Sequence, residues 1–186
     1  MTEHRPLNTS PLPVKLRVED YLLLDGAGAF EDYGKTELIE GKVFFMNAQH
    51  RPHGRLQTKL ASLLLNALPP PLEPIVEGSI PIPPANVPQP DIVVTSEPDG
   101  EGLIPLASVR LVIEIADATL AHDLGSKAAV YAGAAIPEYW VVDIQGRTII
   151  QMWSPGGAEF GSRQQTAIGS ILRAQTIDLE IDTKGL

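Results

Sequence analysis

The sequence predicts a single α/β (α+β) domain in which a mixed β-sheet is flanked by helices. The 186 residues suffice for one domain with a sizeable core, and 44% of them are hydrophobic, as in ordinary globular proteins. Several apolar stretches have the length of strands, whereas two longer stretches have helical periodicity. Successive strands around one long helix and one shorter helix are typical of a sheet covered by helices.

The first 17 residues are rich in proline and polar side chains, so we expect a flexible arm ahead of one domain spanning residues 18–186. A short helix is predicted from Val18 to Leu24. Its first turn contains Glu19 and Asp20, where carboxylates interact favourably with the helix dipole.

A hairpin and the long helix are predicted next. Residues 36–47 have apolar stretches on both sides of Glu40-Gly41, which indicates two strands joined by a turn. Pro52 suits the first turn of a helix that runs to Leu68, where a run of three prolines ends it. The apolar stripe expected to face the core consists of Leu56, Leu60, Leu63, Leu64 and Ala67.

The remaining elements are mainly strands. Apolar, β-branched stretches bounded by proline and glycine predict them. In order, we expect strands at 75–80, 91–95 and 111–115, a helix at 123–134, and a hairpin whose turn is at 143–147. Short strands with glycine turns are expected to follow.

Composition limits the chemistry. The chain has no cysteine, which excludes disulfides, thiolate metal sites and cysteine nucleophiles. Oxygen and imidazole ligands therefore remain, and they favour Mg²⁺ or Mn²⁺ over a structural zinc. A net charge of −9 argues against non-specific nucleic-acid binding by the whole surface, although a local basic patch is compatible with it. No apolar run could span a membrane, and a cytoplasmic location is expected.

Glu114 is the most informative residue. It lies inside the stretch Leu111–Ala116, which is otherwise apolar and therefore resembles a central strand buried on both faces. An ionised carboxylate in such a strand is costly unless it is paired or bound to a cation. Glu114 is therefore part of a buried ion pair, a residue at the wet end of the strand, or part of a functional site; we favour the functional site.

Asp91 is the natural partner of Glu114. It begins a predicted strand directly after Gln89-Pro90. An Asp at this position is often an ordinary turn residue, but it can also project toward a carboxylate on a neighbouring strand. Two converging carboxylates repel each other unless one is protonated or a cation lies between them. The pair therefore predicts a site for Mg²⁺ or Mn²⁺.

Lys127 and Glu40 each have two interpretations. Lys127 lies four residues after Asp123 in a predicted helix, so it is either half of a solvent-facing ion pair or an ammonium group directed at the carboxylates. Glu40 is either a plain turn residue or a third carboxylate of the metal site.

The densest basic segment surrounds the start of the long helix. His53, Arg55 and Lys59 are candidates for binding substrate phosphates. The alternative for Arg55 and Lys59 is one solvated helix face. His53 is a metal ligand, a phosphate contact or a structural histidine.

These motifs, read in order, resemble the Uma-two family of endonucleases in the PD-(D/E)XK restriction-endonuclease-like superfamily. The resemblance spans about residues 18–153. It rests on the order and spacing of ELIEG, the helix that begins near His53, Gln89-Pro90-Asp91, Val112–Ile115, Asp123–Lys127 and Ile136–Asp143.

The resemblance implies a restriction-endonuclease-like core with a metal-dependent phosphodiesterase site. Asp91 and Glu114 match the two acidic residues that hold the metal. The superfamily's lysine lies two residues after the second acid, but that position is Ala116 here. Lys127 matches a lysine that this family carries on the following helix. Glu40 matches the family's early acid, and His53 matches a histidine at the helix start.

The function implied is metal-dependent hydrolysis of nucleic-acid phosphodiester bonds, with DNA expected as substrate in preference to RNA. Two alternatives stay open: a binding or assembly module that no longer cuts, and a hydrolase of smaller phosphorylated substrates. We also predict a homodimer, for which the strands of Trp140 and Trp153 are a candidate surface unless they belong to the core.

Overall fold

A six-stranded mixed sheet forms the centre of the computed structural model, which describes residues 12–46 and 50–186. Within the sheet, β5 and β6 are parallel, and the other neighbouring strands are antiparallel. The predicted mixed sheet is therefore confirmed. In spatial order the strands are β3 (Glu73–Val76), β4 (Ile92–Thr95), β5 (Val109–Ala116), β6 (Glu138–Asp143), β7 (Thr148–Gly156) and β8 (Glu159–Ala167).

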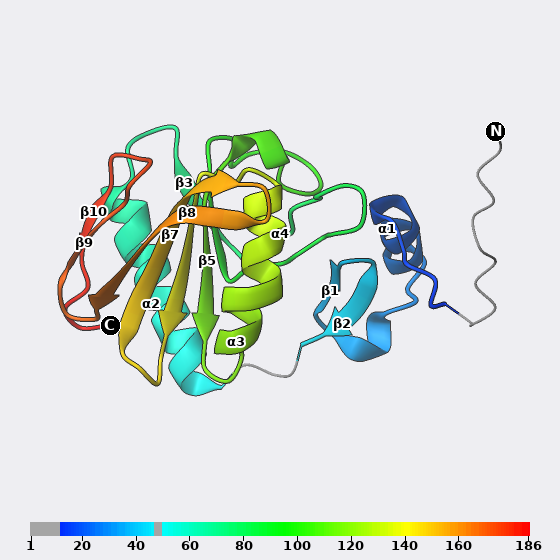
Figure 1. Ribbon diagram of the computed structural model, residues 1–186, viewed down its shortest axis with the longest axis horizontal. Helices are drawn as coiled ribbons and strands as arrows, with labels where there is room; N and C mark the ends of the chain where they lie inside the picture. Colours follow the sequence, from blue (N-terminus) through cyan, green and yellow to red (C-terminus); the bar gives the residue numbers. More distant parts are fainter. Residues whose placement is uncertain (1–11, 47–49) are drawn as a thin grey trace, which may run out of the picture.

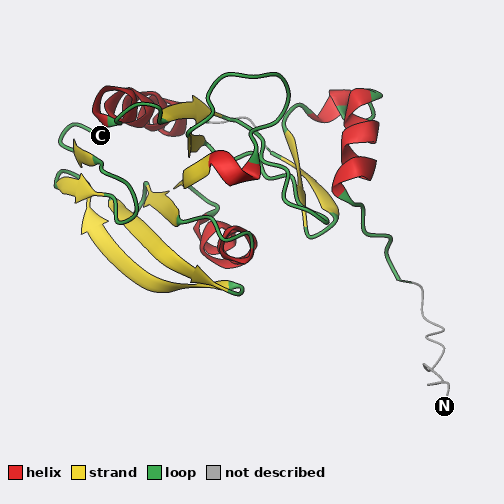
Figure 2. Cartoon of the chain, turned by 90° about the horizontal axis from the view of Figure 1, so that it is seen from above, coloured by secondary structure: helices red, strands yellow, loops and turns green. Residues whose placement is uncertain are grey.

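Helices cover both faces of this sheet (Figures 1 and 2). On one face, α2 (Arg51–Ala67) packs Leu56, Leu60 and Leu64 against alternate residues of β4, β5 and β6. On the other face lie α3 (Leu120–His122), a π-helical turn η3 (Asp123–Lys127) and α4 (Ala128–Gly133). Strand β5 is thus buried on both faces, as its continuous apolar sequence predicts.

The amino-terminal part packs beside the sheet (Figure 1). It comprises α1 (Val18–Gly26), the 3₁₀ turn η1 (Glu31–Tyr33), and the hairpin of β1 (Thr36–Ile39) and β2 (Lys42–Phe45). Two backbone hydrogen bonds join Leu38 to Val87, so β1 is attached to the segment that leads into β4. Helix α1 begins at Val18 as expected, whereas residues 1–11 of the predicted arm lie outside the described residues.

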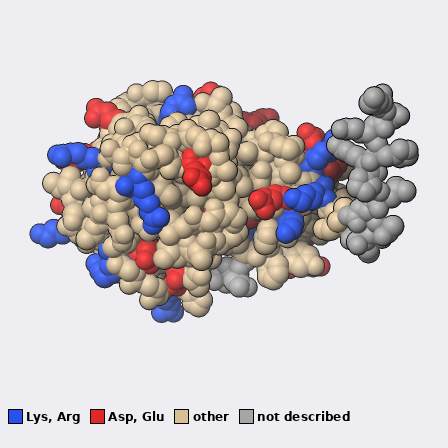
Figure 3. All heavy atoms as spheres, in the orientation of Figure 1, with Lys and Arg blue, Asp and Glu red and all other residues tan. Residues whose placement is uncertain are grey.

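The carboxyl-terminal hairpin of β9 (Ile171–Arg173) and β10 (Glu180–Asp182) packs on the α2 side of the sheet. A second 3₁₀ turn, η2 (Leu106–Ser108), leads into β5. On the molecular face drawn in Figure 3, acidic and basic side chains are scattered among uncharged ones. Within the described residues, no helix is long and apolar enough to cross a membrane.

Three details differ from the sequence-based expectations. Strand β3 ends at Val76 instead of Ile80, because Glu77 has a φ of 55° and leaves the extended conformation. The helix predicted at 123–134 begins at Leu120 and includes the π-helical turn. Trp140 is fully buried in the core, so its side chain offers no surface for the predicted homodimer.

Candidate functional site

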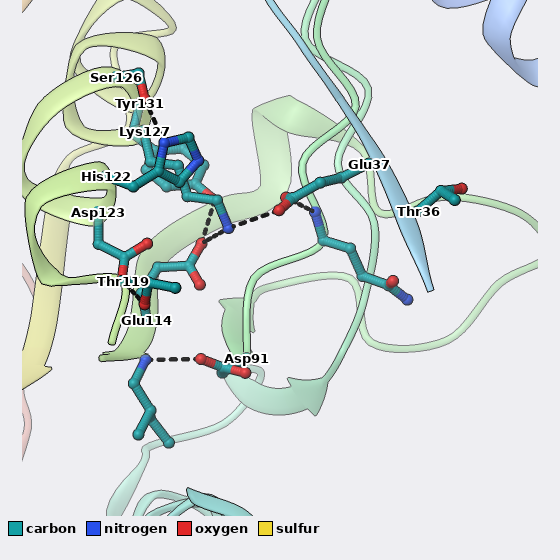
Figure 4. Close-up of polar contacts among 12 residues, drawn as sticks. Thr36, Glu37, Asp91, Glu114, Thr119, His122, Asp123, Ser126, Lys127 and Tyr131 are labelled. Carbon is teal, nitrogen blue, oxygen red and sulfur yellow. Dashed lines mark hydrogen bonds and ion pairs between the residues drawn. The ribbon is translucent and has the colours of Figure 1, made fainter. Parts of the chain in front are cut away.

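Strand pairing places Asp91 opposite Glu114. In the antiparallel ladder of β4 and β5, Ile92 pairs with Ile113. Continuing this register by one residue brings Asp91 opposite Glu114. Directly opposed residues project from the same face of the sheet. A carboxylate oxygen of Asp91, Oδ2, accepts a hydrogen bond from the Ile115 backbone N–H at 2.7 Å (Figure 4). Both carboxyl groups line one cavity of about 410 Å³.

Glu114 is held by the helical layer above it. Side chains alternate along β5, so Glu114 points to the same side as Val112 and Ala116, toward α4. Its Oε1 atom accepts hydrogen bonds from Lys127 Nζ at 2.9 Å and from the Tyr131 hydroxyl at 2.8 Å. Figure 4 shows the second carboxylate oxygen directed away from these donors, toward the side where Asp91 lies.

The π-helical turn brings Lys127 to this carboxylate. Asp123 and Lys127 lie at its two ends, and both side chains are buried. Lys127 Nζ also lies 3.1 Å from Oε1 of Glu37 on β1, and its side chain is 2% exposed. The lysine therefore lies between two carboxylates that come from different parts of the chain. π-Helical turns are frequently found at functional sites.

Burial and charge together set the protonation of this pair. Burial raises the pKa of Glu114 to about 8, although the charge of Lys127 opposes the increase. Burial alone would lower the pKa of Lys127, but the carboxylates of Glu114 and Glu37 outweigh it and raise that pKa above its usual value. Lys127 therefore remains a cation at neutral pH and is unsuited to act as a general base.

His53 contacts the other carboxylate. Its Nε2 atom lies 3.2 Å from Asp91 Oδ1 at the start of α2, and the Gln57 side chain donates to the Asp91 backbone carbonyl. Burial would lower the pKa of His53, but the hydrogen bond and charge of Asp91 outweigh it, so the pKa is raised. Of the three interpretations of His53, the structure adds only that its ring lies beside Asp91.

A third acid of the cavity is Asp123. Its Oδ2 accepts a hydrogen bond from the Thr119 hydroxyl at 2.6 Å, and its side chain is buried. Burial raises the pKa of this carboxyl group, against the effect of the Thr119 hydrogen bond. The residues that line the cavity are Lys35, Phe45, Met46, His50, His53, Gln89, Asp91, Glu114, Ile115, Asp117, Ala118, Thr119, Asp123 and Lys127.

The structure places Glu40 away from this cluster. Glu40 is exposed at the β1–β2 turn, has a φ of 52°, and does not line the cavity. Glu37, which precedes it by three residues, is 1% exposed and contacts Lys127 instead. Glu37 lies within β1, whereas Glu40 follows the last residue of that strand and lies in the exposed turn.

Arg55 and Lys59 also lie outside the main cavity. They line a separate pocket of about 160 Å³ together with Arg147. The predicted basic segment is therefore divided, because α2 directs His53 toward the acidic cavity and these two cations to another part of the surface.

Sequence reasoning missed Glu37, Tyr131 and Asp123. Tyr131 lies four residues after Lys127, and Asp123 lies four before it, so helical spacing alone places the three on one side. That spacing could have indicated that Asp123 and Tyr131 lie near Lys127 in the site. Glu37 gave none that distinguished it from Glu40, because both flank the same apolar pair of residues.

The donor set fits a hard divalent cation. The acids near Glu114 are Glu37, Asp91 and Asp123, whereas Lys127 is the cation that contacts it, so the cluster has an excess of negative charge. Among the described residues, no three His, Asp or Glu side chains are placed to hold a metal by themselves. An ion bound to Asp91 and Glu114 would take its other ligands from water and substrate, as Mg²⁺ commonly does.

A family model covers the segment that contains this site. The family model described as "Uma2: Putative restriction endonuclease" matches residues 18–180. The chain belongs to the Uma2 family. The resemblance noted in the sequence is therefore confirmed.

Solved structures agree with the fold of this Uma2 member. One is described as a putative nuclease belonging to DUF820 from Anabaena variabilis ATCC 29413. The similarity has a TM-score of 0.66 and covers 91% of this chain and 96% of that chain, at 16% sequence identity. At this identity the similarity establishes the nuclease-like fold. Among curated proteins, none matches the chain.

Proposed function

We propose that this Uma2 protein is a Mg²⁺- or Mn²⁺-dependent endonuclease that hydrolyses nucleic-acid phosphodiester bonds, with DNA preferred over RNA. The observation that carries the proposal is the pairing of Asp91 with Glu114 in one cavity, with the Lys127 ammonium group bound to Glu114. Family membership supports the reaction class.

The bound ion would polarise the scissile phosphate and lower the pKa of a coordinated water. Asp91 and Glu114 supply carboxylate oxygens for it. The Ile115 N–H and His53 hold the Asp91 carboxylate in position, and Tyr131 does the same for Glu114. Lys127 lines the cavity as a cation, so its charge stabilises negative charge that develops on the phosphate.

The position of Lys127 supports its assignment to the superfamily lysine's role. The residue two positions after Glu114 is Ala116, which is fully buried. Lys127 instead reaches Glu114 from η3. An ammonium group from a neighbouring helix can thus serve the same carboxylate as one from the strand itself.

The test uses circular substrates, which only an endonuclease can open. Purified protein is incubated with Mn²⁺ and supercoiled plasmid, circular single-stranded DNA or circular RNA. We expect cleavage that falls by at least about 100-fold in Asp91→Asn and Glu114→Gln. Asp99→Asn, in an exposed loop, is the matched control and should cleave normally. Cleavage that persists unchanged in both site variants would exclude this site.

A Mn²⁺ titration by calorimetry separates this proposal from the alternatives. A protein that binds Mn²⁺ through Asp91 and Glu114 but opens no circle is a binding module. A protein that hydrolyses a chromogenic phosphodiester but no nucleic acid acts on smaller substrates.

A further inference from the structure

Two neighbouring aromatic rings are exposed to solvent, and one of them lines the acidic cavity. Tyr33 in η1 and Phe45 in β2 are 54% and 58% exposed. Their ring centroids lie 5.7 Å apart, and the rings are tilted by 44°. Phe45 also lines the cavity that contains Asp91 and Glu114. Exposed rings do not gain the free energy that burial of apolar surface provides. Their exposure beside an acidic site therefore requires an explanation.

The β1–β2 hairpin positions Phe45. Thr36 pairs with Phe45 in the ladder, and the Met46 N–H donates to the Lys35 carbonyl at 2.9 Å. Lys35 and Met46 both line the cavity beside Phe45, as does His50. The cavity lining thus combines a cation, a histidine and an exposed ring on a regular element.

We propose that Phe45 and Tyr33 form a stacking platform for an unpaired base next to the scissile phosphate, so that the substrate is a single-stranded or locally unpaired nucleic acid. This inference rests on the proposed function. A flat ring that is open to solvent accepts a base of any identity, because every base has a π-face. Lys35 is placed to contact the phosphate backbone beside it.

Charge and depth favour an unpaired strand over a duplex. Duplex binding depends on many phosphate contacts, but the chain has a net charge of −9. The charged side chains visible in Figure 3 are mixed in sign. Asp91, Glu114 and Lys127 are only 2–6% exposed, so the scissile phosphate must enter a recessed cavity. A flexible single strand can do so while its base leaves the stack, and stacking on protein rings replaces the lost contacts.

Continuity with the cavity argues for a nucleotide as the occupant. Phe45 belongs both to the exposed ring pair and to the cavity wall, so a base stacked on this ring lies directly beside the cavity of Asp91 and Glu114. A second copy of this chain would instead offer no phosphate group to an ion held by Asp91 and Glu114.

The test measures binding, not cleavage. Fluorescence anisotropy compares a labelled oligothymidine strand with the same strand in a duplex, using full-length protein and Ca²⁺ as a substitute oxygen-seeking cation. Gels check that the strands stay intact. We expect the single strand to bind at least about tenfold tighter than the duplex.

Variants of Phe45 identify the ring as the cause. Phe45→Ala and Phe45→Leu should each weaken single-strand binding about tenfold, whereas Phe45→Trp should retain it. Ile171→Ala is the control, because Ile171 is 57% exposed on β9, at the opposite end of the molecule in Figure 1. Melting curves verify that each variant folds.

Several outcomes would overturn the platform: equal binding of strand and duplex, no binding of either, or wild-type affinity in Phe45→Ala or Phe45→Leu. Light scattering that detects a dimer lost in Phe45→Ala would assign the rings to self-association and also overturn it. The proposed function fails separately. A wild-type protein that binds single strands through Phe45 but cuts none with Mn²⁺ retains the platform and loses the nuclease assignment.

Discussion

Glu114 and Glu138 are both buried acids on neighbouring parallel strands, but their surroundings differ. Glu114 on β5 is 5% exposed, and Glu138 on β6 is fully buried. Ionised carboxylates are costly in such positions unless their oxygens are compensated. Burial alone marks both carboxylates as energetically costly. The groups that contact each carboxylate distinguish a structural role from a functional one.

Glu138 is compensated by neutral donors. Its Oε2 accepts hydrogen bonds from the backbone N–H of Gln175 and Thr176 and from the Thr176 hydroxyl, at 2.8–2.9 Å. Its Oε1 accepts one from Trp140 Nε1 at 2.6 Å. These bonds fasten the segment between β9 and β10 to the central sheet, so Glu138 stabilises the fold.

Glu114 is compensated by a lysine and lies among further acids. Lys127 contacts it, Asp91 lies across the ladder, and a cavity opens beside both. Neutral donors suffice to compensate a purely structural carboxylate, as they do at Glu138, and they do not require further acids nearby that repel it. The surplus of acids at an open cavity is what favours a cation and a reaction at Glu114.

The largest expected effect comes from Glu138→Gln. An amide in place of the carboxylate directs its NH₂ group at donors, so we expect a loss of about 2–4 kcal/mol in the free energy of unfolding. Urea denaturation measures it, and cleavage per folded molecule should stay normal. Glu114→Gln is the opposite case: its unfolding free energy should change by less than about 1 kcal/mol while cleavage is lost. If both variants lost stability equally, the distinction between the two acids would be wrong.

Metal binding should release a proton from Glu114. Because the pKa of Glu114 is raised to about 8, the metal-free protein is mostly protonated there at pH 7, and a metal ligand must be deprotonated. Mg²⁺ affinity should therefore rise about tenfold per pH unit up to about pH 8 and then level off. Calorimetry at pH 6.5 and 8.5, in buffers of different ionisation enthalpy, counts the proton. Equal affinities at the two pH values would contradict this sign.

The smallest effect separates Glu37 from Glu40. Glu37 contacts Lys127 at 3.1 Å and accepts a hydrogen bond from the Gln89 N–H, so Glu37→Gln should loosen the lysine and lower kcat about tenfold with little change in KM. Glu40→Gln, on the exposed turn, should stay within about twofold of the wild type. Steady-state kinetics on a single-stranded substrate provide both values. If Glu40→Gln lost more kcat than Glu37→Gln, Glu40 would be the third acid of the site, as the family resemblance implies.

The sequence alone determined the sheet, the two helical layers and the two central acids. Continuous apolar stretches predicted buried strands, and an acid within one of them stood out because its burial is expensive. The helical stripe of α2 followed from the spacing of its leucines. These features depend on the periodicity of apolar residues and on the free energy of transferring side chains out of water. Both are properties of the local sequence of each segment.

The tertiary structure alone decided which partners those acids have. Whether Lys127 faces solvent or Glu114, and whether Glu37 or Glu40 points inward, depends on how η3 and the β1–β2 hairpin pack against β5. The aromatic pair beside the cavity likewise joins Tyr33 and Phe45 from separate elements. Such contacts arise from the packing of segments distant in sequence, and neither periodicity nor composition encodes that packing locally.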